Sequence, residues 1–281
     1  MKKNWKSGFA GILMTLLMFA PSVSMGQSEK AFIKKYLSEL PSVPVSNALQ
    51  KYRMTALYTN RDLYGNFTGK TKVTGDYTRG LPGDSVTWNN IFISGSNNFS
   101  EPFPAGTKQE YMENIKYVPS PKMVEEEAFK NFPSSPENIY ARNLIWDMMS
   151  FEIFAWSYYD SLKLNDTYII PDITGEFNMA DIGKYSHNKI IVCWNGISEF
   201  SGELCAIVDF TAIDNKIELS MDQIKTKGTE QYWGTILISL KTKNIEHAVM
   251  YSGTIQEIEI KGMKDKFLVK TIRELEVNRI Q

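Results

Sequence analysis

The chain has 281 residues, of which 43% are apolar and 22% charged, a composition typical of a globular protein with a large core. Its formal net charge is −1, but the first 26 residues hold three lysines and no acid, so the remainder carries −4. A mildly acidic chain without clustered Lys and Arg argues against nucleic acid as a partner, because phosphates require such clusters. The same balance provides no attraction to anionic lipid.

The N-terminus predicts a cleavable export signal. Three lysines precede an apolar run from Phe9 to Ala20, which is too short to span a bilayer comfortably. Small residues then precede a cleavage point near Gly26-Gln27. We therefore expect residues 1–26 to be removed and the mature chain to work in the periplasm or outside the cell. An uncleaved membrane anchor is the alternative, and no later segment is apolar enough to cross a membrane.

Several elements are expected before the middle of the chain. Ser28 can cap a short helix that Pro41 ends. Alternating apolar residues and strong turn signals predict strands over 51–60, 67–78 and 85–94, with a bulge or turn at Asn89-Asn90. Residues 94–121 are irregular and predict a long surface connection, and 121–131 predicts a short helix beginning at Pro121.

The second half is again rich in strand patterns. The expected strands are 189–196, 203–211, 216–221, 232–240, 248–260 and 267–277, separated by turn-like pairs such as Asp214-Asn215 and Lys227-Gly228. The last strand is apolar on both faces, so it should lie in the middle of the sheet. The order of strands, helix and strands excludes a Rossmann or TIM arrangement.

These elements predict an α+β fold: a large, twisted, half-barrel-like antiparallel sheet with a buried central helix and a short N-terminal helix. We expect residues 27–281 to form a single β-rich domain. Its two sub-parts, about 47–135 and 165–281, would be joined by the helix 136–164.

The central helix, from Pro136 to about Leu164, is unusually apolar. On a helical wheel its apolar side covers roughly 200°, whereas an ordinary surface helix buries a stripe of little more than 100°. A helix with so little polar surface must be enclosed on most sides, and a sheet curved around it would do this. Its apolar residues include Met148, Met149, Trp156 and Tyr159.

Glu152 is the exception on this apolar side. A carboxylate placed there must pair, accept hydrogen bonds or stay protonated. One interpretation is a polar anchor for the head group of a ligand that also touches Met148, Met149, Trp156 and Tyr159. The other is a structural ion pair with a strand arginine such as Arg79 or Arg273.

The chain has two cysteines, Cys193 and Cys205. If the hairpin between them is symmetric about Glu199, the two cysteines face each other at about 4.5–5.5 Å between Cβ atoms, close to disulfide geometry. An exported protein permits such a bond, but two buried free thiols are an equal alternative. Two cysteines and two histidines form no recognisable zinc pattern.

No catalytic motif is present, and neither His187 nor His247 has a nucleophile beside it in the sequence. We expect no metal or cofactor. The leading hypothesis is a non-catalytic protein that binds an apolar or amphipathic, lipid-like molecule between helix and sheet. A glycan hydrolase with two paired carboxylates among Asp181, Glu199, Glu203 and Asp209 is a second. An envelope module that binds another protein is a third.

Overall fold

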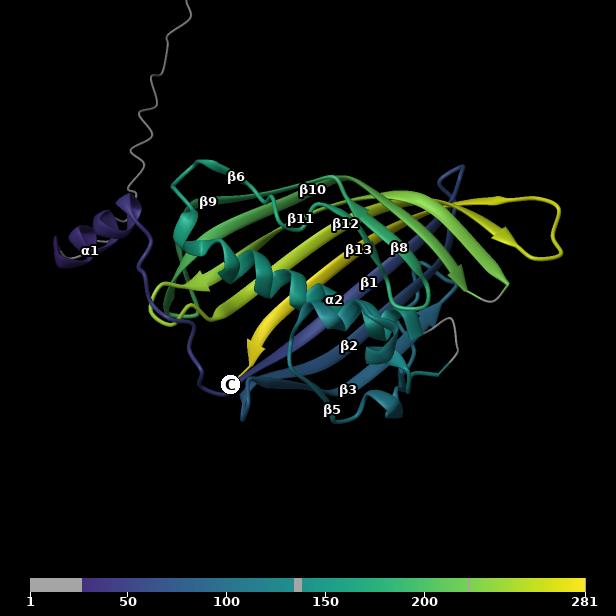
Figure 1. Cartoon of the computed structure of the whole chain (residues 1–281), viewed down its shortest axis with the longest axis horizontal. Helices are drawn as coiled ribbons and strands as arrows, with labels where there is room; N and C mark the ends of the chain where they lie inside the picture. Colours follow the sequence, from purple (N-terminus) through teal and green to yellow (C-terminus); the bar gives the residue numbers. More distant parts are fainter. Residues whose placement is uncertain (1–26, 134–137, 222, 281) are drawn as a thin grey trace, which may run out of the picture.

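The structure, a computed structural model, describes residues 27–133, 138–221 and 223–280. In this part of the chain, one open, twisted antiparallel sheet of thirteen strands carries a long helix across one face (Figure 1). We call that face the inner face. The predicted fold class is therefore confirmed. The predicted export signal, 1–26, and Pro136 lie outside the described residues.

The described residues form two α-helices and five shorter helical turns. The α-helices are α1 (Gln27–Ser38) and α2 (Asn138–Glu152). The shorter turns are the 3-10 helices η1 (Glu110–Met112), η2 (Pro121–Val124), η3 (Glu126–Phe129) and η5 (Tyr159–Ser161), and the π-helix η4 (Ile153–Ser157).

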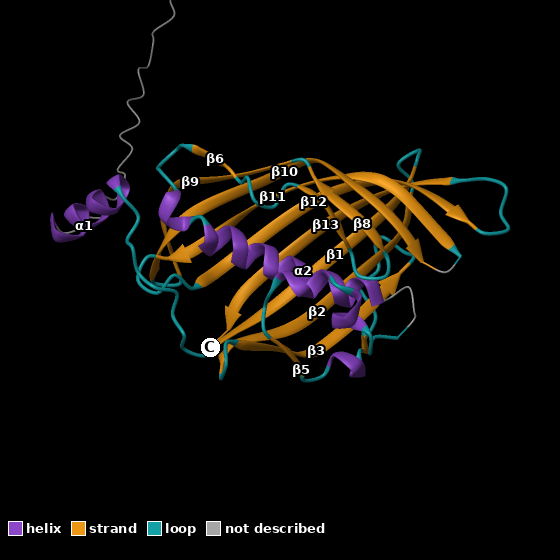
Figure 2. Ribbon diagram, in the orientation of Figure 1, coloured by secondary structure: helices purple, strands orange, loops and turns teal. Residues whose placement is uncertain are grey.

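The strands are β1 (Gln50–Asp62), β2 (Phe67–Leu81), β3 (Ser85–Ser96), β4 (Thr107–Lys108), β5 (Ile115–Tyr117), β6 (Thr167–Ile169), β7 (Gly175–Asn178), β8 (Gly183–His187), β9 (Lys189–Phe200), β10 (Glu203–Met221), β11 (Ile224–Ser239), β12 (Ile245–Ile260) and β13 (Phe267–Ile280). The main order is β4-β3-β2-β1-β13-β12-β11-β10-β8-β7. In addition, β5 pairs with β3, while β9 pairs with both β10 and β6. Figure 2 shows α2 lying obliquely over the long central strands.

The last strand lies in the middle of the sheet, as predicted. β13 pairs with β12 on one side and with β1 on the other, where Met54 faces Val277 and Ala56 faces Leu275. These four side chains are almost completely buried. The β1–β13 pairing therefore joins the two strand-rich halves of the sequence into one sheet.

Side-chain alternation explains which face α2 covers. In β11, Tyr232, Ile236 and Ile238 point to the inner face and are buried, whereas Trp233 points to the opposite face and is about half exposed. A strand places successive side chains on opposite faces, so this period of two determines where the helix packs.

Two turns predicted in the second half are wrong. Residues 203–221 form one strand, because Asp214 adopts a positive φ of 57° and is accommodated as a bulge. β11 likewise runs straight through Lys227-Gly228. A Cβ at Gly228 would lie 2.2 Å from the Ile255 carbonyl oxygen, so this glycine permits close approach of β12 rather than a turn.

The connection from Ser94 to Pro121 is more ordered than predicted. It contains β4, η1 and β5, and both short strands pair with β3, so they cover much of this edge of the sheet. The bulge predicted at Asn89-Asn90 is confirmed by a register shift and by a positive φ of 54° at Asn90. The single helix predicted over 121–131 is instead η2 and η3, because Glu125 between them is extended.

The central helix changes type before its predicted end. α2 is followed directly by the π-helical turn η4, and Tyr158, with φ −117° and ψ 1°, leaves helical geometry. η5 then ends at Ser161, and the next residue, Leu162, has an extended backbone. π-helical turns occur as short insertions in α-helices, frequently at functional sites.

The two cysteines do not face each other, and of the two alternatives the structure has free thiols. The β9–β10 hairpin turns at Ser201-Gly202, both with positive φ, and not at Glu199. Cys193 therefore faces Asp209, and Cys205 faces Ser198. Both cysteines are free thiols, Cys205 buried and Cys193 partly exposed. Burial raises the pKa of Cys205 to about 12.

Candidate functional site

The side of α2 that faces the sheet is tightly packed. Met148 is 1% exposed and belongs to the core, and Phe151 and Phe154 lie against Phe210 with ring centroids 5.8 and 4.9 Å apart. Phe154 also stacks on Tyr232 of β11. A ligand inserted directly between α2 and the sheet would have to displace these side chains.

The opposite side of the helix is also apolar, yet only partly covered. We call Trp146, Met149, Ile153 and Trp156 the outer stripe. The outward side of a surface helix is normally polar, and these positions recur at helical spacing. The indole of Trp146 donates to the Met123 carbonyl at 2.9 Å, and the indole of Trp156 donates to the Lys243 carbonyl at 2.7 Å. These bonds hold the two ends of the stripe.

The structure separates the five residues predicted to touch a ligand. Met148 and Tyr159 lie in the core, and Tyr159 is 0% exposed. Met149 and Trp156 belong to the outer stripe, and Glu152 is 8% exposed. Tyr159 has the Lys243 ammonium 4.5 Å from its ring centroid. Ligand contact by these residues stays a prediction.

Glu152 has two polar partners from β2. Its Oε1 accepts a hydrogen bond from the Tyr77 hydroxyl at 2.8 Å and lies 3.9 Å from Arg79 Nε. The pairing with Arg79 matches the structural interpretation made from sequence. Burial raises the pKa of Glu152, while Arg79 and the Tyr77 hydroxyl act in the opposite direction.

Arg79 connects Glu152 and the outer stripe to an open cavity. Its guanidinium lies 3.9 Å from the ring centroid of Trp156, a cation–π contact. Arg79 also lines a half-open cavity of about 330 Å³. The residues lining this cavity are Asn47, Arg79, Gly80, Leu81, Pro82, Asp84, Val86 and Pro119. We call it the Arg79 cavity.

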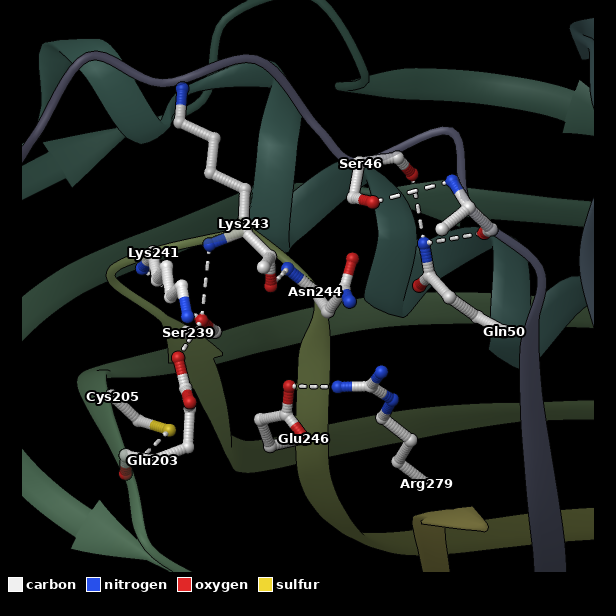
Figure 3. Close-up of polar contacts among 12 residues, drawn as sticks. Ser46, Gln50, Glu203, Cys205, Ser239, Lys241, Lys243, Asn244, Glu246 and Arg279 are labelled. Carbon is white, nitrogen blue, oxygen red and sulfur yellow. Dashed lines mark hydrogen bonds and ion pairs between the residues drawn. The ribbon is translucent and has the colours of Figure 1, made fainter. Parts of the chain in front are cut away.

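The linker before β1 supplies one wall of the Arg79 cavity. Figure 3 shows how polar contacts fix this linker and the β11–β12 turn at one end of the sheet. Gln50 Nε2 donates to the Ser46 carbonyl at 2.8 Å, and the Ser46 amide donates to the Thr242 carbonyl at 2.9 Å. Asn47, between Ser46 and β1, is therefore held beside Gly80. The same turn carries the Lys243 carbonyl that accepts from Trp156.

A second buried polar cluster lies further along α2. Arg273 of β13 contacts Asp147 at 3.1 Å and Glu230 at 3.8 Å, and Glu230 accepts a hydrogen bond from the Tyr185 hydroxyl at 2.7 Å. Burial raises the pKa of Asp147 to about 6, although Arg273 opposes this shift. Sequence patterns did not single out Asp147, because its partner Arg273 is 126 residues away along the chain.

Three of the four carboxylates considered for glycan hydrolysis have polar partners of their own. Asp181 pairs with Arg142, and Asp209 accepts a hydrogen bond from Thr235 at 2.6 Å. Glu203 accepts from the Ser239 hydroxyl at 2.6 Å, a contact visible in Figure 3. Glu199 faces Leu204 and Glu203 faces Phe200, so the Glu199 and Glu203 side chains point to opposite faces of the sheet. The contacts of the described residues therefore do not support that hypothesis.

The histidines lie on strands. His187 Nδ1 is 3.2 Å from the Ile173 carbonyl and its Nε2 is 3.3 Å from the Tyr232 hydroxyl, while burial lowers its pKa. His247 Nδ1 is 2.8 Å from Asn278 Oδ1. Among the residues that the structure describes, no group of three or more His, Cys, Asp or Glu side chains could hold a metal ion. No helix in that part is long and apolar enough to cross a membrane.

The fold and site define an open antiparallel sheet that carries a partly covered apolar helix next to an arginine-lined cavity. No family model and no curated protein matches the chain. One similar solved structure is lipovitellin, described for its lipid–protein interactions, with 13% identity and a TM-score of 0.42. The match covers 83% of this chain and 25% of that one, so the chain spans a quarter of the protein it matches. Another is a DUF1329 family protein from Desulfovibrio piger, with 9% identity, a TM-score of 0.16 and coverage of 82% and 85%.

Proposed function

We propose that the protein is an exported, non-catalytic binder of an apolar or amphipathic, lipid-like molecule. The observation that carries this proposal is the outer stripe of α2, where Trp146, Met149, Ile153 and Trp156 are apolar and partly exposed. Flexible Met side chains and flat aromatic rings adapt to varied apolar ligands. Because the helix–sheet interface is packed, we expect the ligand to lie along the outer stripe and not beneath the helix.

Charge and geometry add to this proposal. Arg79 contacts Trp156 of the outer stripe and also lines the Arg79 cavity, so an apolar surface adjoins a polar one. Ligand sites are commonly apolar with a few placed polar groups. The separate polar contacts of Asp181, Asp209 and Glu203 favour binding over glycan hydrolysis.

Native mass spectrometry of the purified protein, followed by extraction and identification of any retained molecule, gives the first test. The second is titration with the neutral dye Nile red. Because Met149 and Ile153 lie on the outer stripe, the double variant Met149→Gln/Ile153→Gln should weaken dye binding about tenfold, the loss expected when two apolar contacts are removed.

The matched control is Ile255→Gln. Ile255 is 55% exposed on β12, and its side chain points away from the face that carries α2. This variant should bind the dye as the wild type does. Equal losses in both variants, or no dye binding by the wild type together with no retained molecule, would contradict the proposal.

A further inference from the structure

Arg79 has donors that its protein neighbours leave unused. A guanidinium carries five N–H donors. Its Nε lies 3.9 Å from Glu152, beyond hydrogen-bond length, and the same Glu152 oxygen already accepts from Tyr77. Arg79 Nη1 is buried without a hydrogen-bond partner among the described residues. Buried donors are normally paired, so the surroundings of Arg79 lack an acceptor.

Arg79 lines the Arg79 cavity and its side chain is 19% exposed, so an acceptor that enters the cavity reaches this side chain. The cavity volume of about 330 Å³ exceeds that of a carboxylate or phosphate group, and the cavity is half open to solvent. Asn47, whose side chain carries amide donors, also lines the cavity. Asp84, at the β2–β3 turn, is the acid among the lining residues and lowers the attraction for an anion. Figure 3 shows the hydrogen bond from Gln50 to Ser46 that holds the linker in which Asn47 lies.

We propose that the Arg79 cavity binds the anionic head group, a carboxylate or phosphate monoester, of an amphipathic molecule whose apolar part lies on the outer stripe. This inference rests on the proposed function, because the outer stripe must hold the apolar part. The planar guanidinium matches both head groups with two parallel hydrogen bonds. Glu152, predicted from sequence to be the polar anchor, contacts Arg79 from α2 and is a positioning residue.

Isothermal titration of the purified full-length chain with three probes tests this inference. The probes are dodecanoate below its micelle concentration, neutral 1-decanol and inorganic phosphate. Arg79→Gln should weaken dodecanoate binding about tenfold or more, as expected for loss of a charge-assisted hydrogen bond, and weaken binding of the uncharged 1-decanol much less. Arg53→Gln is the control, because Arg53 is an exposed β1 residue that pairs with Asp76.

Two further variants keep the test decisive if Arg79→Gln fails to fold, as judged by near-ultraviolet circular dichroism. Asp84→Asn removes the opposing charge from the cavity and should strengthen dodecanoate binding without affecting 1-decanol. Arg79→Lys retains the charge but not the planar fork, so its dodecanoate affinity should lie between those of the wild type and Arg79→Gln.

The remaining outcomes separate this inference from the proposed function. Dodecanoate binding that is unchanged in Arg79→Gln and Asp84→Asn overturns the head-group inference, while 1-decanol binding still supports the proposed function. Phosphate binding without dodecanoate binding overturns the amphipathic ligand and identifies a free-anion site. Failure of both dodecanoate and 1-decanol to bind the wild type overturns the proposed function and this inference with it.

Discussion

Charged residues beneath α2 make its attachment to the sheet sensitive to pH. Asp147 and Glu152 both face strand arginines, and burial raises the pKa of each carboxyl group. A raised carboxyl pKa means that the folded chain holds a proton that the unfolded chain has released. Stability from such a group is present at low pH and is lost as the pH rises through the folded pKa.

For Asp147 this window extends from about pH 4 to about pH 6, because its pKa rises from 3.8 to about 6. We expect the free energy of unfolding to fall across this window by up to about 1.4 kcal/mol per pH unit, relative to an Asp147→Asn variant that cannot ionise there. Urea unfolding of both proteins at half-unit pH intervals measures the difference. Asp265→Asn, which changes an exposed carboxylate, is the control. A constant difference between wild type and Asp147→Asn from pH 4 to 6 would show that Asp147 has an ordinary pKa.

At the scale of elements, the fit between α2 and the sheet depends on a glycine in β2. A Cβ at Gly75 would lie 2.4 Å from Ile91 Cδ1 and 3.3 Å from Leu144 Cδ1 of the helix. Leu144 is completely buried, so it has little freedom to move. The absence of a side chain at Gly75 therefore lets the helix lie close to β2.

Gly75→Ala should lower the free energy of unfolding by about 1–3 kcal/mol, the usual cost of overpacking a filled core. Gly253→Ala on β12, three strands away in the sheet, is the matched control, since a Cβ there meets nothing within 4 Å. It should be neutral or slightly stabilising, because alanine restricts the unfolded chain. Chemical unfolding of the two variants side by side gives the comparison, and similar values for both would mean that α2 does not pack closely on β2.

The whole molecule depends on a pairing between its first and last strands. β1 and β13 are more than 200 residues apart in sequence, yet they pair along twelve positions. Long strands at the centre of a sheet are hydrogen-bonded to a neighbour on both sides, which protects their amides from hydrogen exchange. Edge strands have a neighbour on one side only. α1 lies at one end of the sheet beside β9, and most of its described side chains are exposed (Figure 1).

Hydrogen exchange should therefore be slowest in β1, β11, β12 and β13 and fastest in α1 and the edge strand β7. Mass spectrometry of peptic peptides after timed exchange in D₂O would provide this ranking. Slow central strands that open together would show one cooperative unit. If β13 exchanged as quickly as β7, its central position would be wrong.

The parts of the fold that were predictable from sequence rest on local patterns. Period-two alternation in residues 232–240 and the wide apolar surface of α2 both identified buried faces. This was possible because the residues on a buried face are apolar and recur with the period of the strand or helix. Glu152 was recognised as a charge needing a partner, and Arg79 was among the partners considered. The cysteine register was not predictable, since a hairpin centred two residues away fits the same apolar pattern.

By itself, the sequence determined an α+β chain with a largely antiparallel sheet, a central last strand and a helix with too little polar surface to lie exposed. Only the tertiary structure decided which side of α2 packs against the sheet and which predicted turns are bulges. It also decided that Arg79 lies between Glu152, Trp156 and an open cavity. The reason is physical: hydrophobic periodicity is local along the chain, whereas packing and charge pairing depend on residues that meet only when distant strands pair.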